Sequence, residues 1–280
     1  MTTSLSRIPR TRDAERFGPR AMTRDPRPDH GRPLETEYRP RHPLDLRRTV
    51  LYQRRGAGDP TMAVSGAVIW RVSRAPAGIA TLAIRETHPG VIRGAAWGPG
   101  SEWALAQLPA LCGADDDPAD FDASRHPLIA DAHHRNPGLR LSRTDLVFDA
   151  LVSAIFEQKV TGMQAFGAWR RVVTWCGERA PGPTPAPMFA PPTIDGWQHV
   201  PSWVWHRSGL EPPQSKTVVR VARRGDAIVR TVLAAEDGEA VDRVLVSQPG
   251  IGPWTSAETR IRALGEEPAP GVGRLPRAHA

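Results

Sequence analysis

Two glycines that are separated by one residue lie between two apolar, helix-like segments near the end of the chain. They belong to the run Pro249-Gly250-Ile251-Gly252-Pro253-Trp254-Thr255, which follows Val241, Val244 and Leu245 at helical spacing. Glycine lets a backbone adopt positive φ and approach another molecule closely. The first N–H groups of a helix that begins near Thr255 have no partner within the helix and favour an anion. The run therefore predicts a hairpin that grips backbone phosphates, with a purely structural turn between helices as the alternative.

A basic segment precedes this hairpin. Lys216, Arg220, Arg223 and Arg230 share it with a single acid, Asp226. Such a face suits the flank of a nucleic-acid site, because positive side chains neutralise phosphates. A solvated helix face has the same composition, so that alternative stays open.

Aromatic and amide side chains could complete a pocket for a base. The indoles of Trp203, Trp205 and Trp254 could stack on a ring, and Gln158 at the end of a helix-like segment could line the cavity. Tryptophans also fill cores, and a Gln at a helix end can serve as a cap. We expect the pocket residues to be Gln158, Trp203, Trp205 and Trp254.

The elements that must position these residues change type along the chain. Short β-type runs at 44–46, 49–51, 67–72, 79–84 and 91–93 are separated by Gly and Pro turns. They predict a small, largely antiparallel sheet.

The pattern becomes helical after the sheet. We expect helices at 101–112 and at 144–159, where apolar residues recur at spacings of three and four. Thr161 and Gln164 then have the spacing of a capping box, which predicts a helix start. The proline-rich stretch 180–193 is expected to be an extended connection within the same domain.

The overall charge favours a polyanionic partner without naming one. The 280 residues carry a formal net charge of +7. Residues 1–43 hold ten arginines, six acids and seven prolines with almost no apolar run, so we expect a disordered tail there. The folded part is then only mildly basic.

The cysteines and the lengths of the apolar runs indicate which cellular compartment and which kinds of site the chain can have. Cys112 and Cys176 are far apart, with neither disulfide-framework nor zinc spacing, and no run of 18 apolar residues appears. We therefore expect a reducing, cytosolic compartment, no zinc site and no membrane span.

The residues 249–255 resemble the hairpin of the helix-hairpin-helix superfamily of base-excision DNA glycosylases, and specifically the DNA-3-methyladenine glycosylase II group. The stretch 148–160, which contains Gln158, is similar to that group's pocket-lining helix. His206-Arg207-Ser208-Gly209-Leu210 with Lys216 resembles the turn that leads toward the hairpin. The β region 44–97 is similar to the group's extra N-terminal α/β domain. Together the resemblance covers about residues 44–264.

This resemblance implies base-excision repair: hydrolysis of the N-glycosidic bond of an alkylated purine, such as 3-methyladenine, flipped out of double-stranded DNA. Gly250, Ile251, Gly252, Thr255, Lys216 and Arg220 would contact the DNA backbone. Bifunctional members carry a lysine two residues after the second hairpin glycine. Trp254 stands there, so the resemblance implies a monofunctional hydrolase without a lyase step. It also implies a monomer that uses no metal and no cofactor and acts in the cytoplasm, at the bacterial nucleoid.

The chain departs from the family at the catalytic aspartate. The family places it about 25 residues after the hairpin proline, in a Gly-Asp pair, whereas this sequence has Gly273-Arg274. No catalytic residue is therefore assigned, and we expect impaired hydrolysis. The run from Gly273 is also compatible with a reading frame displaced by one base, so we expect 266–280 to be an irregular, out-of-frame tail.

The sequence thus predicts an α+β protein. Its expected parts are a disordered tail (1–43), an α/β domain with a small antiparallel sheet (44–135), an all-helical glycosylase domain (136–265) and the irregular tail (266–280). The expected function is that of an alkylpurine DNA glycosylase. The alternative is a non-catalytic helix-hairpin-helix protein that binds the DNA backbone.

Overall fold

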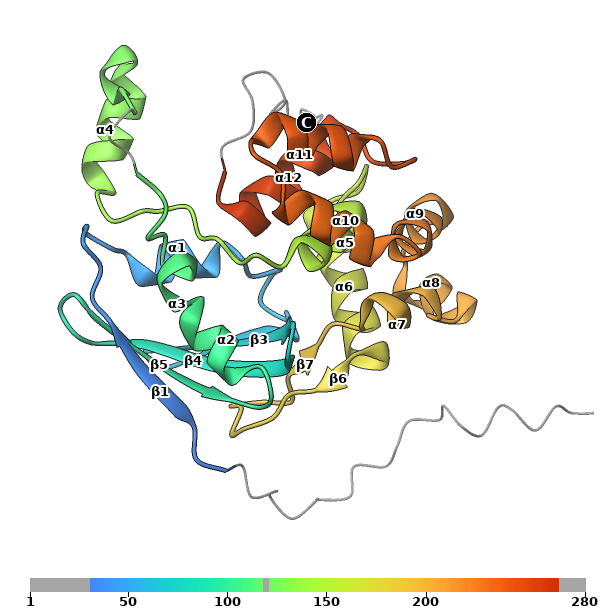
Figure 1. Ribbon diagram of the computed structural model, residues 1–280, viewed down its shortest axis with the longest axis horizontal. Helices are drawn as coiled ribbons and strands as arrows, with labels where there is room; N and C mark the ends of the chain where they lie inside the picture. The colour runs from blue at the N-terminus through green and yellow to red at the C-terminus, as the bar shows by residue number, and fades with distance from the viewer. Residues whose placement is uncertain (1–30, 118–120, 267–280) are drawn as a thin grey trace, which may run out of the picture. The chain divides into compact units, whose positions relative to one another are not determined.

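A five-stranded antiparallel sheet forms one part of the fold. The computed structural model describes residues 31–117 and 121–266 (Figure 1). The strands run in the order β1-β5-β4-β3-β2, and every neighbouring pair is antiparallel. β5 alternates buried and half-buried residues from Ile92 to Trp97, whereas β4 is buried at every position from Ile79 to Leu82, where Ile79 packs in a cluster with Met188 and Ala190. Their bounds are β1 Leu34–Tyr38, β2 Met62–Ser65, β3 Val68–Ala75, β4 Gly78–His88 and β5 Val91–Trp97.

The edge strand β1 corrects the expected limit of the tail. Residues 34–38 were expected to be disordered, yet Leu34 pairs with Ala96 and Tyr38 pairs with Ile92 of β5. Backbone hydrogen bonds to a neighbouring strand order this segment, and composition alone does not reveal such pairing. Residues 1–30 of the expected tail lie outside the described residues.

Residues 46–51 also differ from the expectation. They form helix α1, Leu46–Leu51, and not the β-type runs predicted around them. Asp45 caps this helix, because its side chain accepts a hydrogen bond from the backbone N–H of Arg48 at 3.0 Å. Val50 is fully buried, so tertiary packing of one helix face outweighs the β propensity of the segment.

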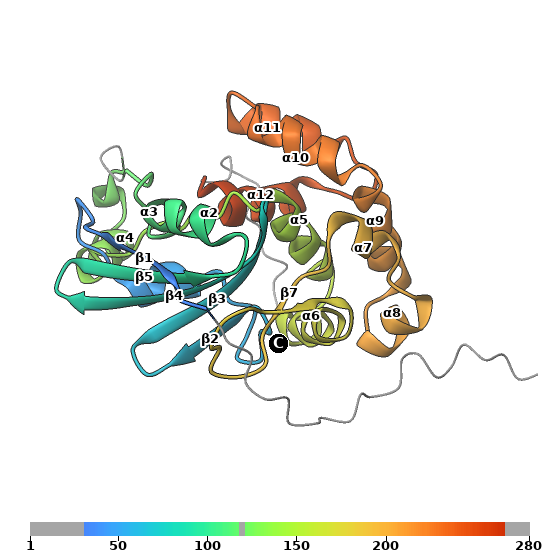
Figure 2. The same cartoon turned by 60° about the horizontal axis from the view of Figure 1, so that its bottom comes forward.

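Two short helices cover the sheet. The expected helix at 101–112 is divided into α2, Ser101–Ala106, and α3, Leu108–Leu111 (Figure 2). Gly94 of β5 allows this close packing, since a Cβ there would lie 2.9 Å from the Leu108 side chain. The core between the helices and the sheet includes Val50, Ile69, Ile84 and Leu108.

The helices after residue 146 form a second apolar core around α5, whereas α4 contributes no buried residue. Phe156, Trp169 and Trp197 are its largest fully buried side chains. The predicted capping box is confirmed, with Thr161 and Gln164 bonded reciprocally. The helices are α4 Pro127–Arg135, α5 Val147–Phe156, α6 Gly162–Cys176, α7 Ile194–Gln198, α8 Ser202–Ser208, α9 Pro212–Ala222, α10 Gly225–Leu233, α11 Gly238–Val246 and α12 Pro253–Leu264, and the 3-10 turn η3 spans Ala123–Arg125.

The proline-rich segment attaches the helices to the sheet. It carries a short ladder of β6, Glu178–Arg179, and β7, Phe189–Ala190, so the part expected to be all-helical contains two small strands. The Thr81 hydroxyl donates to the Pro181 carbonyl at 2.6 Å, and the Phe189 N–H donates to the Pro60 carbonyl at 2.9 Å. Hydrogen bonds therefore cross between the sheet and the helical part.

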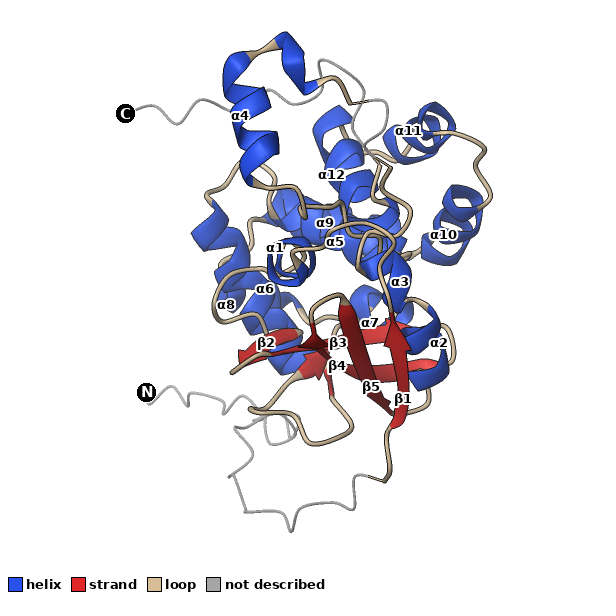
Figure 3. Cartoon of the chain, turned by 90° about the vertical axis from the view of Figure 1, so that its left-hand side faces the viewer, coloured by secondary structure: helices blue, strands red, loops and turns tan. Residues whose placement is uncertain are grey.

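The mixture of sheet and helices confirms the α+β class (Figure 3). The described residues belong to one compact unit with separate sheet and helix cores, and a division at 135 stays a prediction. No helix within 31–117 or 121–266 is long and apolar enough to cross a membrane.

Candidate nucleic-acid interface

The glycine hairpin lies between α11 and α12, as predicted. Gly250 has φ +93°, and a Cβ there would lie 2.6 Å from the Thr217 hydroxyl of α9. The fold therefore requires glycine at 250. Gly252 has φ −102° and nothing within 4 Å of its Cβ direction. Its position is open to another molecule.

The hairpin has outward donors and an inward anchor. The backbone N–H groups of Gly252 and Trp254 have no hydrogen-bond partner among the described residues. They lie at the start of α12, where a helix favours negative charge. Ile251 differs from the expected DNA contact: its side chain is 5% exposed and its N–H donates to the Gln248 carbonyl at 3.0 Å. It anchors the hairpin to the core.

Gln158 braces the hairpin from the end of α5. Its side-chain amide donates to the Gly250 carbonyl at 3.0 Å and to the Thr255 hydroxyl at 2.9 Å. Thr255 is 2% exposed, so its side chain faces inward and leaves only backbone for a phosphate. Both side chains therefore position the hairpin from its inner side, and their expected contacts with a base and with DNA stay predictions.

Helix α9 places positive charge beside the hairpin. Arg220 donates through Nη1 to the Pro249 carbonyl at 3.0 Å, and Lys216 is exposed one turn earlier on the same face. Gln214 in the first turn of α9 donates to the Gln158 carbonyl at 2.7 Å. The predicted basic segment is thus joined to the hairpin, although it is broken at Arg223 into α9 and α10.

The predicted tryptophan pocket is not assembled. Trp205 is 7% exposed and stacks on Trp197 in the helical core, with ring centroids 6.0 Å apart. Trp203 is exposed and lies beside Trp175 at 6.5 Å. Residues two positions apart on a helix point to different sides, so Trp203 and Trp205 cannot share one pocket. Of the expected four, only Trp254 and Gln158 belong to the hairpin region.

A cluster of ionisable groups beside the hairpin was not predicted. Arg262 of α12 donates through Nε to Glu258 at 2.7 Å, and its guanidinium lies 4.9 Å from the centre of the Tyr52 ring. Burial raises the pKa of Glu157, the residue before Gln158; the Arg262 cation opposes this rise and the Glu258 carboxylate adds to it. Sequence periodicity could not reveal this cluster, because it joins α1, α5 and α12 through tertiary contacts.

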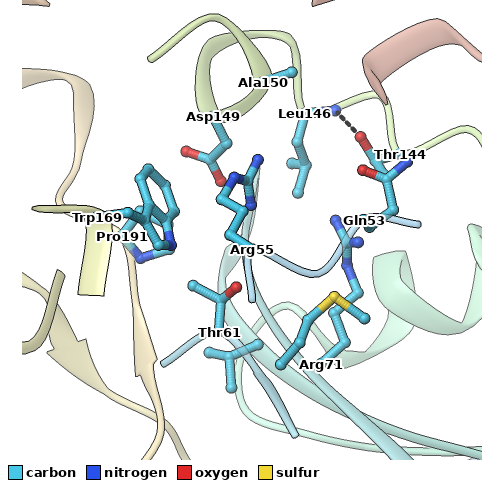
Figure 4. A pocket seen from close by; sticks show the side chains of 12 residues that line it. Gln53, Arg55, Thr61, Arg71, Thr144, Leu146, Asp149, Ala150, Trp169 and Pro191 are labelled. Carbon is cyan, nitrogen blue, oxygen red and sulfur yellow. Dashed lines mark hydrogen bonds between the residues drawn. The ribbon is translucent and has the colours of Figure 1, made fainter. Parts of the chain in front are cut away.

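A small cavity joins the sheet to the helices (Figure 4). Its volume is about 20 Å³, which suffices for a water and not for a base. Burial raises the pKa of Asp149 to about 6, against the opposing attraction of Arg55 and Arg71. Burial also lowers the pKa of Arg71 to about 10, assisted by Arg55. The Arg55 guanidinium donates to the Ser153 hydroxyl and lies over Trp169, so this cluster holds the two parts of the fold together.

The position of the family aspartate and most of the irregular tail are outside the part of the chain that the structure describes. Arg274 occupies this position. Within the described residues, no three His, Cys, Asp or Glu side chains gather as a metal site.

The fold is similar to that of solved DNA glycosylases. No protein-family model and no curated protein sequence matches the chain. A 3-methyladenine DNA-glycosylase from Archaeoglobus fulgidus superposes with a TM-score of 0.70 at 16% identity, covering 83% of this chain and 80% of that one. The apo form of an 8-oxoguanine glycosylase/lyase from Clostridium acetobutylicum gives 0.62 at 12% identity, with coverages of 84% and 81%. The expected resemblance to the helix-hairpin-helix glycosylases is confirmed at the level of the fold.

Proposed function

We propose that the chain is a base-excision DNA glycosylase that acts on alkylated purines, such as 3-methyladenine, flipped from double-stranded DNA. The observation that carries the proposal is the open, braced hairpin within a glycosylase fold. Gly252 leaves space for a phosphate, the free N–H groups of Gly252 and Trp254 attract it, and Lys216 and Arg220 add positive charge. Backbone binding of this kind positions DNA without reading its sequence.

The proposed reaction breaks the bond between C1′ and the base nitrogen. The bond's electron pair leaves with the alkylated base, which is already positively charged, so little acid catalysis is needed. Water then adds to C1′ and loses its proton. The bifunctional position holds Trp254, and the only two lysines are Lys159 and Lys216. The proposal is therefore hydrolysis without a lyase step.

We further propose that hydrolysis is impaired because Arg274 occupies the position of the family aspartate. A preorganised negative charge that stabilises a cationic transition state accelerates reactions by about 10²–10³-fold. Glu157 supplies a partly buried carboxylate near the hairpin, but it lies on α5 and its protonation is favoured by burial. It would replace the aspartate incompletely.

Two assays on the full chain test the proposal. The affinity for a short DNA duplex, measured at several salt concentrations, tests whether the hairpin binds the DNA backbone. Release of free methylated bases from a methylated duplex tests the reaction. We expect salt-dependent duplex binding and slow base release. Duplex binding without release above spontaneous depurination would indicate the non-catalytic alternative, and absence of binding would contradict both.

A further inference from the structure

A second cavity lies where the loop after β1 meets the end of α3. Its volume is about 370 Å³, within the range of about 300–1,000 Å³ for small-molecule sites. The loop 38–44 forms one wall, residues 109–115 form another, and Arg140 closes the site between them. Neither the hairpin nor the cluster around Glu157 contributes to it.

The walls carry an excess of positive charge. Arg39, Arg41 and Arg140 line the cavity together with His42, against a single carboxylate, Asp115. Asp115 forms its ion pair with Arg143 at 3.8 Å, outside this set. Within 31–117 and 121–266, the guanidinium groups of Arg39 and Arg41 have neither an ion pair nor a hydrogen bond. These charges are therefore available to a ligand.

Arg140 supplies a second, independent indication. Its Nε is buried and has no hydrogen-bond partner in the part of the chain that the structure describes, while its Nη1 donates to the Leu139 carbonyl at 2.8 Å. Buried donors without an acceptor are uncommon, because folding removes them from water. The Nη2 group of Arg140 is not buried and has no hydrogen-bond partner among the described residues, so it is the donor that an acceptor in the cavity can reach.

The cavity is preformed. The Asp45 N–H donates to the Gly138 carbonyl at 2.7 Å, and the Arg140 N–H donates to the Thr49 hydroxyl at 3.2 Å, so the segment that carries Arg140 is fixed to α1 and its cap, directly after the loop 38–44. Gly113 has φ +77°, and a side chain there would collide with that of Arg140. Binding would thus require little ordering of the walls.

The chemistry of the residues that line the cavity limits which ligands can bind there. Burial raises the pKa of the Cys112 thiol to about 12, so this wall residue stays protonated and supplies neither a nucleophile nor a soft metal ligand. Arginine forks match the oxygen geometry of phosphate better than that of a spherical anion. The Tyr38 hydroxyl adds a neutral donor on the same loop.

We propose that this cavity binds a phosphate group through Arg39, Arg41 and Arg140. Two sources share this chemistry: a free phosphorylated small molecule, or the backbone of bound DNA. The inference stands on the cavity alone and does not depend on the proposed glycosylase activity.

Calorimetric titration of the full chain with pyrophosphate and with AMP tests the first source. We expect saturable binding to the wild-type chain that weakens by about tenfold or more in Arg39→Gln/Arg41→Gln, because each lost charge-assisted pair is a strong contact. Arg140→Met, which keeps the aliphatic packing, should weaken it similarly. Arg47→Gln on exposed α1 is the matched control and should leave binding unchanged. Arg39 and Arg41 are exposed, so their variant stays informative even where Arg140→Met fails to fold.

A duplex titration of the same variants tests the second source. If the phosphate belongs to DNA, Arg39→Gln/Arg41→Gln lowers duplex affinity relative to Arg47→Gln, and pyrophosphate alone binds weakly. If it belongs to a free ligand, duplex affinity is unchanged while pyrophosphate or AMP binding is lost. Equal affinities of wild type and double variant in both titrations would overturn the inference.

Discussion

The side-chain amide of Gln158 donates a hydrogen bond to the Gly250 carbonyl at 3.0 Å and thereby ties the end of α5 to the glycine hairpin. The two residues are 92 positions apart in sequence. Because α5 is the central buried helix, this bond links the proposed DNA-binding turn to the core. The hairpin is therefore held before DNA arrives, which lowers the ordering cost of binding.

Gln158→Glu should loosen the hairpin. The substitution keeps the shape of the side chain but replaces the donor by a carboxylate that faces the Gly250 carbonyl and loses the donated bond to Thr255. An unpaired, part-buried group of this kind costs about 1–3 kcal/mol. We expect the free energy of unfolding to fall by that amount and duplex affinity to fall further, and denaturant unfolding with duplex titration measures both.

Gln107→Glu is the matched control. Gln107 also donates to two oxygens, at Arg143 and Asp145, but beside the sheet. The free energy of unfolding of Gln107→Glu should fall by an amount comparable to that of Gln158→Glu, while the duplex affinity of the folded molecules should not change. Equal losses of affinity in the two variants would refute the bracing role of Gln158.

The two hairpin glycines should respond differently to alanine. Gly252→Ala meets no atom within 4 Å and has an ordinary φ, so the melting temperature should not change. Its methyl group would obstruct a close phosphate, and duplex affinity should fall by about tenfold, or about 1.4 kcal/mol.

Gly250→Ala should instead destabilise the fold. Its Cβ would lie 2.6 Å from the Thr217 hydroxyl at φ +93°, a conformation that costs at least about 1–3 kcal/mol for alanine. Thermal unfolding distinguishes the pair. Unchanged duplex affinity in Gly252→Ala would argue against the hairpin as the DNA contact.

Lys216→Gln should change the salt dependence of DNA binding. Lys216 is exposed on α9 beside the hairpin and forms no ion pair among the described residues, so its removal leaves the fold unaffected. Removing one phosphate contact lowers the slope of log affinity against log salt by about 1. Arg85→Gln, on the exposed end of β4, should leave the slope at the wild-type value. The interpretation fails if both variants behave alike.

Asp149→Asn should alter the pH dependence of stability. Burial raises the pKa of Asp149 in the folded protein to about 6, so the folded chain holds a proton that the unfolded chain releases near about pH 4. The free energy of unfolding therefore falls as pH rises through this interval. We expect Asp149→Asn to stabilise the protein by up to about 3 kcal/mol at about pH 8 and to match wild type near about pH 4. Urea unfolding at several pH values measures the difference, and a constant offset would contradict it.

Local signals in the sequence predicted local structure well. The Thr161 and Gln164 capping box needs only residues three apart, and the hairpin glycines report a backbone requirement that depends little on the remainder of the fold. Both were found where expected. The exposed basic face that contains Lys216 was also predictable from the sequence, because exposed charged residues follow the helix periodicity.

Contacts between segments far apart in the chain could not be predicted from the sequence. Trp205 has the same residue type and neighbourhood as Trp203, yet one is in the core and the other on the surface. Arg262 and Glu258 can pair within α12 because they are four residues apart, but their approach to Glu157 depends on how α5 packs against α12. The bond from the Gln158 amide to the hairpin was not predicted, since only the packed structure brings these two segments together.

Single-turnover release of 3-methyladenine from methylated duplex DNA tests the central claim most directly. The Archaeoglobus fulgidus glycosylase provides a reference under the same conditions. We predict release above the spontaneous rate, slower than the reference by about 10²-fold or more because Arg274 occupies the position proposed for the catalytic carboxylate, and lowered by about tenfold in Gly252→Ala at subsaturating protein. No release above the spontaneous rate from saturating, bound duplex would contradict the assignment of a glycosylase, and a rate equal to the reference would contradict its impairment.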